Sequence, residues 1–152
     1  MKQLDFHDVK GKKVKEPDQY TWRPAVYGIL KENNKLLVIQ PNWDDKFCLP
    51  GGSMNLGETL IQTLKREFLE ETGFIVSVSE QPIFVDSQLF GNHKVSKFFQ
   101  RISLYYEVRR VAKTKKKLDS ETTKLQWIDF SKVSDKDFTF FQRDCIKNLK
   151  HS

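Results

Sequence analysis

Apolar and polar positions alternate along much of this chain, and the alternation predicts a fold dominated by strands. In the segment 96–109, apolar Ile102 and Leu104 alternate with polar Ser103, so this run is expected to form a long strand. Asn33-Asn34 separates two shorter apolar runs and tolerates the positive φ angles of a hairpin turn. Further strands are predicted from runs rich in β-branched and aromatic residues at 22–30, 35–40, 46–49, 74–78, 83–88 and 125–130, with a turn at 90–93.

Two segments follow a helical period instead. The first, 58–72, is followed by Gly73, and glycine commonly ends helices in a left-handed conformation. The second comes after Ser134, which forms a capping-box pattern with Asp137, and its apolar residues recur at helical spacing up to Leu149. Strands, a helix, strands and a second helix in this order predict a mixed α/β domain rather than an alternating β-α-β fold.

Length and composition fit one globular domain. A chain of 152 residues with 38% hydrophobic and 12% aromatic residues can bury a substantial core and is unlike a disordered chain. Residues 1–20 are polar and lysine-rich and are expected to form an arm or edge segment, with the single domain over 21–152.

Charge and cysteine content narrow the functional classes. No apolar run approaches the ~20 residues that span a bilayer, so no membrane association is expected. Cys48 and Cys145 show no metal-ligand spacing and are expected to be free thiols in a cytoplasmic protein. The net charge of +6 suits polyanionic partners such as nucleotides or RNA, without deciding between them.

Candidate chemistry is concentrated between residues 51 and 73. On a helix, Glu67, Glu70 and Glu71 share an arc of about 100° that overlaps the apolar stripe containing Leu64 and Phe68. Crowded, partly buried carboxylates either have raised pKa values or bind a cation, and oxygen donors at this density suit Mg²⁺ or Mn²⁺. The alternative, if the flanking glycines are left aside, is a helix with a solvated acidic flank.

The glycines around these acids complete a recognisable pattern. A glycine is followed after five residues by Glu58 and after seven more by the stretch 66–74. The fixed positions are Gly52, Glu58, Arg66, Glu67, Phe68, Glu70, Glu71, Gly73 and Phe74. This stretch resembles the Nudix box at every fixed position. The resemblance implies an α/β/α sandwich with a mixed sheet and hydrolysis of a diphosphate linked to another moiety, with a divalent metal.

The resemblance also implies roles for individual residues. Glu67, Glu70 and Glu71 would be metal ligands, together with a backbone carbonyl of Gly52. Glu58 lies on the other side of the helical wheel, so it is expected to support the helix entry through Arg66. Relatives differ in the general base, and the candidates for the catalytic acids here are Glu67, Glu70, Glu71 and Glu121, with Asp119 as a second late-loop choice.

Substrate choice depends on residues outside the box. Arg23, Trp43 and Phe47 are the candidate substrate-binding residues, because bases stack on aromatic rings and arginine binds phosphate. Leu89 and Gly91 occupy the places where the family's ADP-ribose and dinucleoside-polyphosphate markers would stand. The resemblance therefore favours a MutT-like enzyme that converts a nucleoside triphosphate to a monophosphate and pyrophosphate.

Three alternatives stay open. The enzyme would act on ADP-ribose or nucleotide sugars, or it would be an RNA 5′-end pyrophosphohydrolase, or the domain would sense nucleotides without hydrolysis. The lysine run at 113–117 motivates the RNA alternative, but it is expected to be a solvated loop. The expected partner is a small nucleotide, with RNA less favoured, duplex DNA not expected, and the protein a monomer or homodimer.

Overall fold

The computed structural model describes residues 6–8, 11–14, 20–92, 97–114 and 123–152. The strands are β1 (Phe6–Asp8), β2 (Lys13–Val14), β3 (Thr21–Trp22), β4 (Ala25–Ile29), β5 (Lys31–Glu32), β6 (Lys35–Pro41), β7 (Gly51–Ser53), β8 (Phe74–Val78), β9 (Phe84–Asn92), β10 (Lys97–Lys113) and β11 (Thr123–Asp129). The helical elements are α1 (Leu60–Thr72), the 3₁₀ turns η2 (Asp135–Asp137) and η3 (Phe140–Gln142), and α2 (Arg143–Lys150).

The larger sheet is mixed, as the pattern predicted. Its main path runs β2-β1-β9-β10-β4-β7, and β3 and β8 also pair with the long strand β10. Strand β10 is parallel to β4 and antiparallel to β9. A second sheet has the order β11-β6-β5. The hairpin between β5 and β6 turns at Asn33 and Asn34, whose φ angles are 50° and 63°, which confirms the predicted turn.

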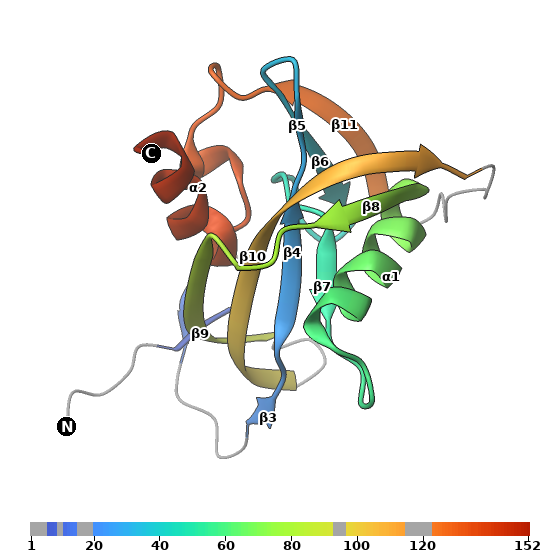
Figure 1. Cartoon of the computed structure of the whole chain (residues 1–152). Helices are drawn as coiled ribbons and strands as arrows, with labels where there is room; N and C mark the ends of the chain where they lie inside the picture. The colour runs from blue at the N-terminus through green and yellow to red at the C-terminus, as the bar shows by residue number, and fades with distance from the viewer. Residues whose placement is uncertain (1–5, 9–10, 15–19, 93–96, 115–122) are drawn as a thin grey trace.

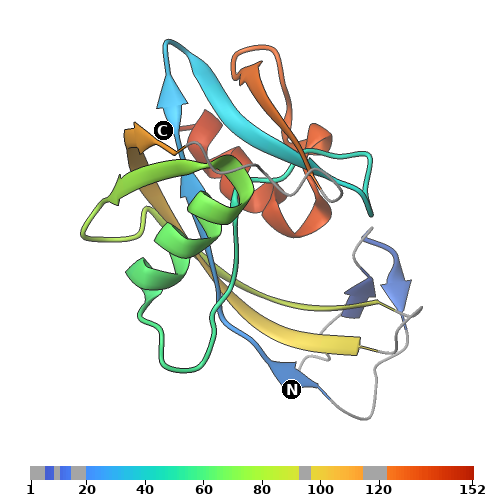
Figure 2. The same cartoon turned by 90° about the vertical axis from the view of Figure 1, so that its right-hand side faces the viewer.

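Helical layers cover both sides of β4 and β10, which makes an α/β/α sandwich (Figure 1). Helix α1 buries Leu64 and Phe68 against one side of the sheet. The segment that ends in α2 buries Phe141, Cys145 and Ile146 against the other side. Figure 2 shows α1 lying across the strands, with the loop from β7 leading into it.

The ends of α1 follow from local sequence. Thr59 caps the helix, and its hydroxyl accepts a hydrogen bond from the Gln62 backbone N–H while the Gln62 side chain accepts one from the Thr59 N–H. The helix therefore begins at Leu60, two residues later than the predicted start at residue 58. It ends where predicted, because Gly73 adopts the left-handed conformation at φ 73° and donates to the Leu69 carbonyl.

Two predictions were wrong, one for the segment before β7 and one for the end of β9. The predicted strand at 46–49 forms only isolated bridges at Phe47 and Cys48, and the strand follows at Gly51–Ser53. The predicted turn at 90–93 is strand as far as Asn92, because Phe90 and Gly91 pair with β10 on one side and β1 on the other. His93 lies outside the described residues.

Two further predictions were wrong in their extent. The run 22–30 is not one strand, because it breaks around Pro24, whose carbonyl accepts a hydrogen bond from Met54 instead. The predicted C-terminal helix after Ser134 forms η2, then extended backbone at Phe138, then η3 and α2. Hydrogen bonds between Phe47 and this extended segment replace the helical pattern.

The remaining expectations concern the periphery and the thiols. Strand β1 pairs with β9 at the edge of the larger sheet, and β2 pairs with β1. Cys48 and Cys145 are free and buried, as expected, and burial raises the pKa of both thiols. No helix among the described residues is long and apolar enough to cross a membrane.

Candidate active site

Helix α1 places two carboxylates directly against strand β7. A Cβ atom on Gly52 would lie 2.7 Å from the carboxyl carbon of Glu67, so only glycine leaves room for this carboxylate. The backbone N–H of Gly51 donates to the Glu71 carboxylate. Gly51 itself has φ 146°, and a Cβ there would lie 2.1 Å from the Val26 carbonyl oxygen. The two glycines thus let β7 pass close beneath the acidic face of the helix.

Glu71 is the most buried acid of this group. Burial raises its pKa well above the ordinary value, and the adjacent charge of Glu67 and a hydrogen bond between the two side chains raise it further. Its Oε2 atom is buried and has no hydrogen-bond partner among the described residues. The predicted overlap of the acids with the apolar stripe is confirmed for Glu67 and Glu71, which are partly buried on the helix that buries Leu64 and Phe68, and was wrong for Glu70, which is exposed.

Arg66 connects the carboxylates to one another. Its guanidinium donates two hydrogen bonds to Glu58, one to Glu67 at 2.9 Å and one to Glu70 at 3.4 Å. A further bond of 3.2 Å reaches the Ser53 carbonyl on β7. The bonds from Arg66, with the Asn55 backbone N–H, lower the pKa of Glu58 to about 2. The expected support of the helix entry by Glu58 through Arg66 is therefore present.

Glu70 stands apart from the other two predicted ligands. Its side chain is 49% exposed, against 16% for Glu67. Within the described ranges, no three carboxylate, imidazole or thiol groups converge tightly enough to enclose a metal ion. The structure thus brings Glu67, Glu71 and Gly52 together and leaves Glu70 at the rim, joined through Arg66.

The other predicted residues lie in different places. Glu121 and Asp119 fall outside the described residues. Arg23 is exposed, with its guanidinium carbon 5.8 Å from the centre of the Phe99 ring. Phe47 packs edge-on against Phe138 at the border of the core.

Trp43 has a surface position beside the aromatic part of the core. Its side chain is 44% exposed, and one face lies nearly parallel to the ring of Phe141, with the ring centres 6.4 Å apart. Of the two aromatic candidates for substrate binding, Trp43 is exposed and Phe47 is partly buried.

Sequence reasoning missed Arg101, which the structure brings to the edge of the site. Its guanidinium donates to the Tyr27 hydroxyl at 2.8 Å and to the Ser53 hydroxyl at 3.3 Å. The sequence does show that Arg101, Ser103 and Tyr105 occupy alternate positions of β10. Their side chains therefore lie on the same face of the sheet. Both Ser103 and Tyr105 are buried, and Tyr105 belongs to the core cluster that contains Phe141 and Cys145 of the C-terminal segment.

Comparisons with known proteins identify the family of this chain. A family model described as NUDIX domain matches residues 21–149. An uncharacterized Nudix hydrolase, YvcI, from Bacillus subtilis (strain 168) is 30% identical over 108 residues, which cover 69% of this chain and 65% of that protein. The m7GpppN-mRNA hydrolase of Saccharomyces cerevisiae (strain ATCC 204508 / S288c) is 29% identical over 107 residues, which cover 70% of this chain and only 10% of that protein.

A solved structure shows the same fold. The crystal structure of the MutT protein from Methanosarcina mazei Go1 superimposes with a TM-score of 0.66 and 20% sequence identity, covering 88% of this chain and 96% of that one. The match of the family model to most of the chain, together with this fold, shows that the protein belongs to the Nudix hydrolase family.

Proposed function

We propose that the protein is a divalent-metal-dependent pyrophosphohydrolase that converts a nucleoside triphosphate to a monophosphate and pyrophosphate. Nudix hydrolases act on phosphorus-containing anhydrides. The observation that carries the proposal is the pair of crowded carboxylates, Glu67 and Glu71, packed against the Gly51–Ser53 strand in an intact Nudix box.

The donor set fits a hard cation such as Mg²⁺ or Mn²⁺. Glu71 Oε2 is a buried oxygen without a partner among the described residues, and a second carboxylate lies beside it. Gly52 leaves the space next to Glu67 free of a side chain. Glu67, Glu71 and the carbonyl of Gly52 would hold the cation, with Glu70 joining from the rim. When bound, such a cation neutralises the charge that develops on the phosphates and makes water more acidic.

The remaining chemistry belongs to the side chains. Water attacks phosphorus, the bridging P–O bond breaks, and pyrophosphate leaves with the electron pair of that bond. A carboxylate must accept the proton of the attacking water, and Glu70, Glu71 and Glu121 are the candidates for this general base. Arg66 holds Glu67 and Glu70 in position through hydrogen bonds of 2.9 and 3.4 Å.

A substrate panel tests this proposal. The protein is incubated with Mg²⁺ or Mn²⁺ and with nucleoside triphosphates, nucleotide sugars, ADP-ribose, dinucleoside polyphosphates or 5′-triphosphate RNA, and released phosphate and pyrophosphate are measured. We expect the highest kcat/KM with a nucleoside triphosphate and loss of turnover with a chelator. A higher kcat/KM with ADP-ribose or a nucleotide sugar would make that compound, and not a nucleoside triphosphate, the substrate. No turnover of any compound would favour a nucleotide sensor.

RNA is the second candidate substrate. It is favoured by the 29% identity over 107 residues to a yeast m7GpppN-mRNA hydrolase and by the net charge of +6. Lysines at 113, 115, 116 and 117 are the sequence feature that would contact an extended polyanion. Of these, only Lys113 lies within the described residues, where it ends β10.

Replacing the four lysines by serine distinguishes the two substrates. If they contact RNA, the salt dependence of RNA binding should flatten by up to about three units, at a slope of about −0.7 per phosphate contact. RNA 5′-end hydrolysis should then collapse while mononucleotide hydrolysis stays constant. We expect no such collapse, because the small nucleotide is the favoured substrate.

A further inference from the structure

Arg101 holds its positive charge against the strand that carries the box glycines. The guanidinium bonds the hydroxyl of Ser53, the last residue of β7, while the Ser53 carbonyl accepts a bond from Arg66. The charges of Arg101 and Glu71 both act on the pKa of Tyr27, the first lowering it and the second raising it. Arg101 therefore contacts the same strand, β7, against which the carboxylates pack, through Ser53 and through Tyr27, the partner of Gly51.

Tyr27 is a neutral connector between these charges. It pairs with Gly51 in the sheet, and burial raises the pKa of its phenol, so the hydroxyl stays protonated. Because this oxygen already accepts a hydrogen bond from Arg101, its own proton can be donated elsewhere. A guanidinium and a phenol side by side offer two donors to an anionic oxygen.

The ring of Phe141 joins Arg101 to an aromatic surface. The guanidinium carbon of Arg101 lies 5.8 Å from the centre of this ring, and the Trp43 ring lies 6.4 Å from it at 25° to its plane. Tyr27 packs against the same ring at 6.0 Å. Trp43 thus lies beside Phe141 while 44% of its side chain stays exposed to solvent. This is a supported platform for stacking a planar group.

Phe141 is anchored to the sheet through its backbone. Its carbonyl accepts hydrogen bonds from the Gln88 amide at 3.0 Å and from the Tyr105 hydroxyl at 3.4 Å. Both donors belong to the sheet, on strands β9 and β10, so the C-terminal segment cannot shift without breaking them. Arg101 and Trp43 thus lie next to the same ring, whose backbone is bonded to the sheet.

We propose that Arg101 and Trp43 form the nucleotide-binding subsite of this protein, in which Arg101 binds a phosphate oxygen and Trp43 stacks on the base. This inference rests on the proposed function, because it assumes that the diphosphate lies at Glu67 and Glu71. The indole then selects substrates with a planar base, whereas the guanidinium binds any substrate with the shared phosphates. Of the three predicted substrate-binding residues, Trp43 fills this role, and Arg101 is added to them.

Two substrates separate the contributions of the two residues. The kcat/KM is measured for a nucleoside triphosphate and for inorganic triphosphate, which has the phosphates and no base. In Trp43→Ala, the ratio of the two kcat/KM values should fall about tenfold, the effect expected for one base–aromatic stack. In Arg101→Ala, kcat/KM should fall roughly 10- to 100-fold for both compounds, with little change in their ratio.

Matched variants control for position and folding. Arg109→Ala removes an exposed arginine from the same strand, and Trp22→Phe removes an exposed tryptophan from β3. Thermal melting identifies variants that fail to fold, and for these Arg101→Lys and Trp43→Phe provide milder changes. Arg101→Lys should recover only part of the activity, because an ammonium lacks the planar fork. An Arg101 variant that behaves like Arg109→Ala would overturn the role of Arg101.

Binding without turnover keeps this inference separate from the proposed reaction. Intrinsic fluorescence is titrated with α,β-methylene ATP in the presence of Mg²⁺. We expect quenching in the wild-type protein and in Trp22→Phe, and its loss in Trp43→Phe, which lacks the indole. Calorimetry on Trp43→Ala should show about tenfold weaker binding. Quenching that persists in Trp43→Phe would overturn the stacking role. Quenching without hydrolysis of any panel compound would contradict the proposed reaction and support the subsite.

Discussion

The carboxylate end of the candidate site comes from one continuous stretch, 51–72, whereas its aromatic end is assembled from distant segments. Glu58, Arg66 and Glu67 belong to this one stretch, and direct hydrogen bonds join Arg66 to both glutamates. Trp43, Arg101 and Phe141 meet only because β10 and the C-terminal segment pack together. The two ends therefore differ in how their geometry is determined, locally in the first and by tertiary packing in the second.

This difference suggests how the two ends divide their work. The local end holds crowded acids at fixed spacing, which suits chemistry on a diphosphate that all substrates share. The assembled end depends on side chains that the motif does not specify, so it can differ between proteins with the same box. Substitutions should therefore affect every substrate at the first end and the choice among substrates at the Trp43 position.

The largest effect is expected for Glu71→Gln. Loss of a ligand and of its charge should lower kcat at least ~10²-fold for nucleoside triphosphate and inorganic triphosphate alike. Glu71 has a raised pKa in the folded state, so the folded protein binds more protons than the unfolded chain and stability falls as pH rises through this window. The amide removes this effect, so the melting temperature in the absence of divalent metal should rise or stay level.

Glu107→Gln is the matched control, because Glu107 is an exposed glutamate on β10. Glu70→Gln extends the test to the carboxylate at the rim, where the same loss of kcat is expected if Glu70 is a ligand. Near-normal activity in Glu71→Gln or in Glu70→Gln would remove that glutamate from the set of catalytic residues. A loss confined to one of the two substrates would contradict the division between the two ends.

An intermediate effect is expected at the box glycines. In Gly52→Ala, the added methyl would meet the Glu67 carboxylate at 2.7 Å and displace it, which should lower kcat about 10- to 100-fold while the protein stays folded. In Gly51→Ala, the methyl would meet the Val26 carbonyl oxygen at 2.1 Å in a backbone conformation with φ 146°. This variant should instead lose stability, by about 1–3 kcal/mol or more. Kinetics and denaturant unfolding on both variants check the contrast.

The same division explains what could be predicted from the sequence. The helix, its end at Gly73 and the sharing of one face by Glu67 and Glu71 follow from spacing along the chain, and the structure confirms them. Arg101 could not be predicted, because its role depends on which face of β10 the C-terminal segment covers. The turn expected at 90–93 failed for a similar reason, since pairing with β1 and β10 keeps Gly91 extended.

The C-terminal helix shows the limit of local signals in another way. The Ser134–Asp137 capping box is present, yet it caps only one 3₁₀ turn. Phe138 is extended because the neighbouring backbone bonds to Phe47, a contact between residues far apart in sequence. Tertiary pairing thus outweighed a correct local signal.

Glu121 lies outside the described residues, so its role as a general base stays a prediction.

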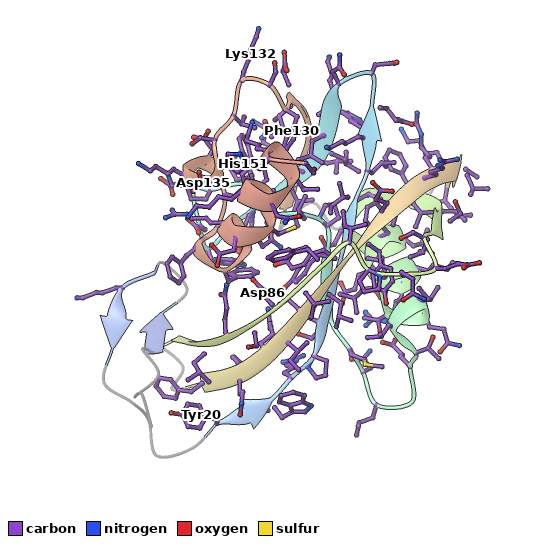
Figure 3. The ribbon with its side chains drawn as sticks, turned by 60° about the vertical axis from the view of Figure 1, so that its left-hand side comes forward. Tyr20, Asp86, Phe130, Lys132, Asp135 and His151 are labelled. Atoms are coloured by element: carbon purple, nitrogen blue, oxygen red, sulfur yellow. The ribbon has the colours of Figure 1, made fainter. Side chains whose placement is uncertain are left out.

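The smallest effect is expected at Asp86, on β9 beneath the C-terminal segment (Figure 3). Burial, together with the charge of Asp144 on α2, raises its pKa to about 6, although a hydrogen bond from Gln88 opposes this. Tyr105 on β10 and Cys145 on α2 also face this carboxylate. The Oδ1 atom is buried and has no hydrogen-bond partner among the described residues. Asp86 thus weakens the contact between the sheet and the segment that carries Phe141.

The substitution Asp86→Asn tests how much this carboxylate lowers the stability of the protein. Between about pH 4 and pH 6 the folded protein binds more protons at Asp86 than the unfolded chain does, so the wild-type protein loses stability as pH rises through that window. Because Asp86 is partly exposed, the loss should be only about 1 kcal/mol, or roughly 2–4 °C in Tm. Burial also raises the pKa of Asp44, so melting curves from pH 4 to pH 8 are recorded in a Glu71→Gln, Asp44→Asn background, which separates Asp86 from both other raised carboxyls of the described residues. In that background, Asp86→Asn should flatten the fall of the melting temperature with rising pH. Glu80→Gln, at an exposed loop position, should leave this fall unchanged. An equal decline with and without Asp86 would mean that this carboxylate does not strain the aromatic end.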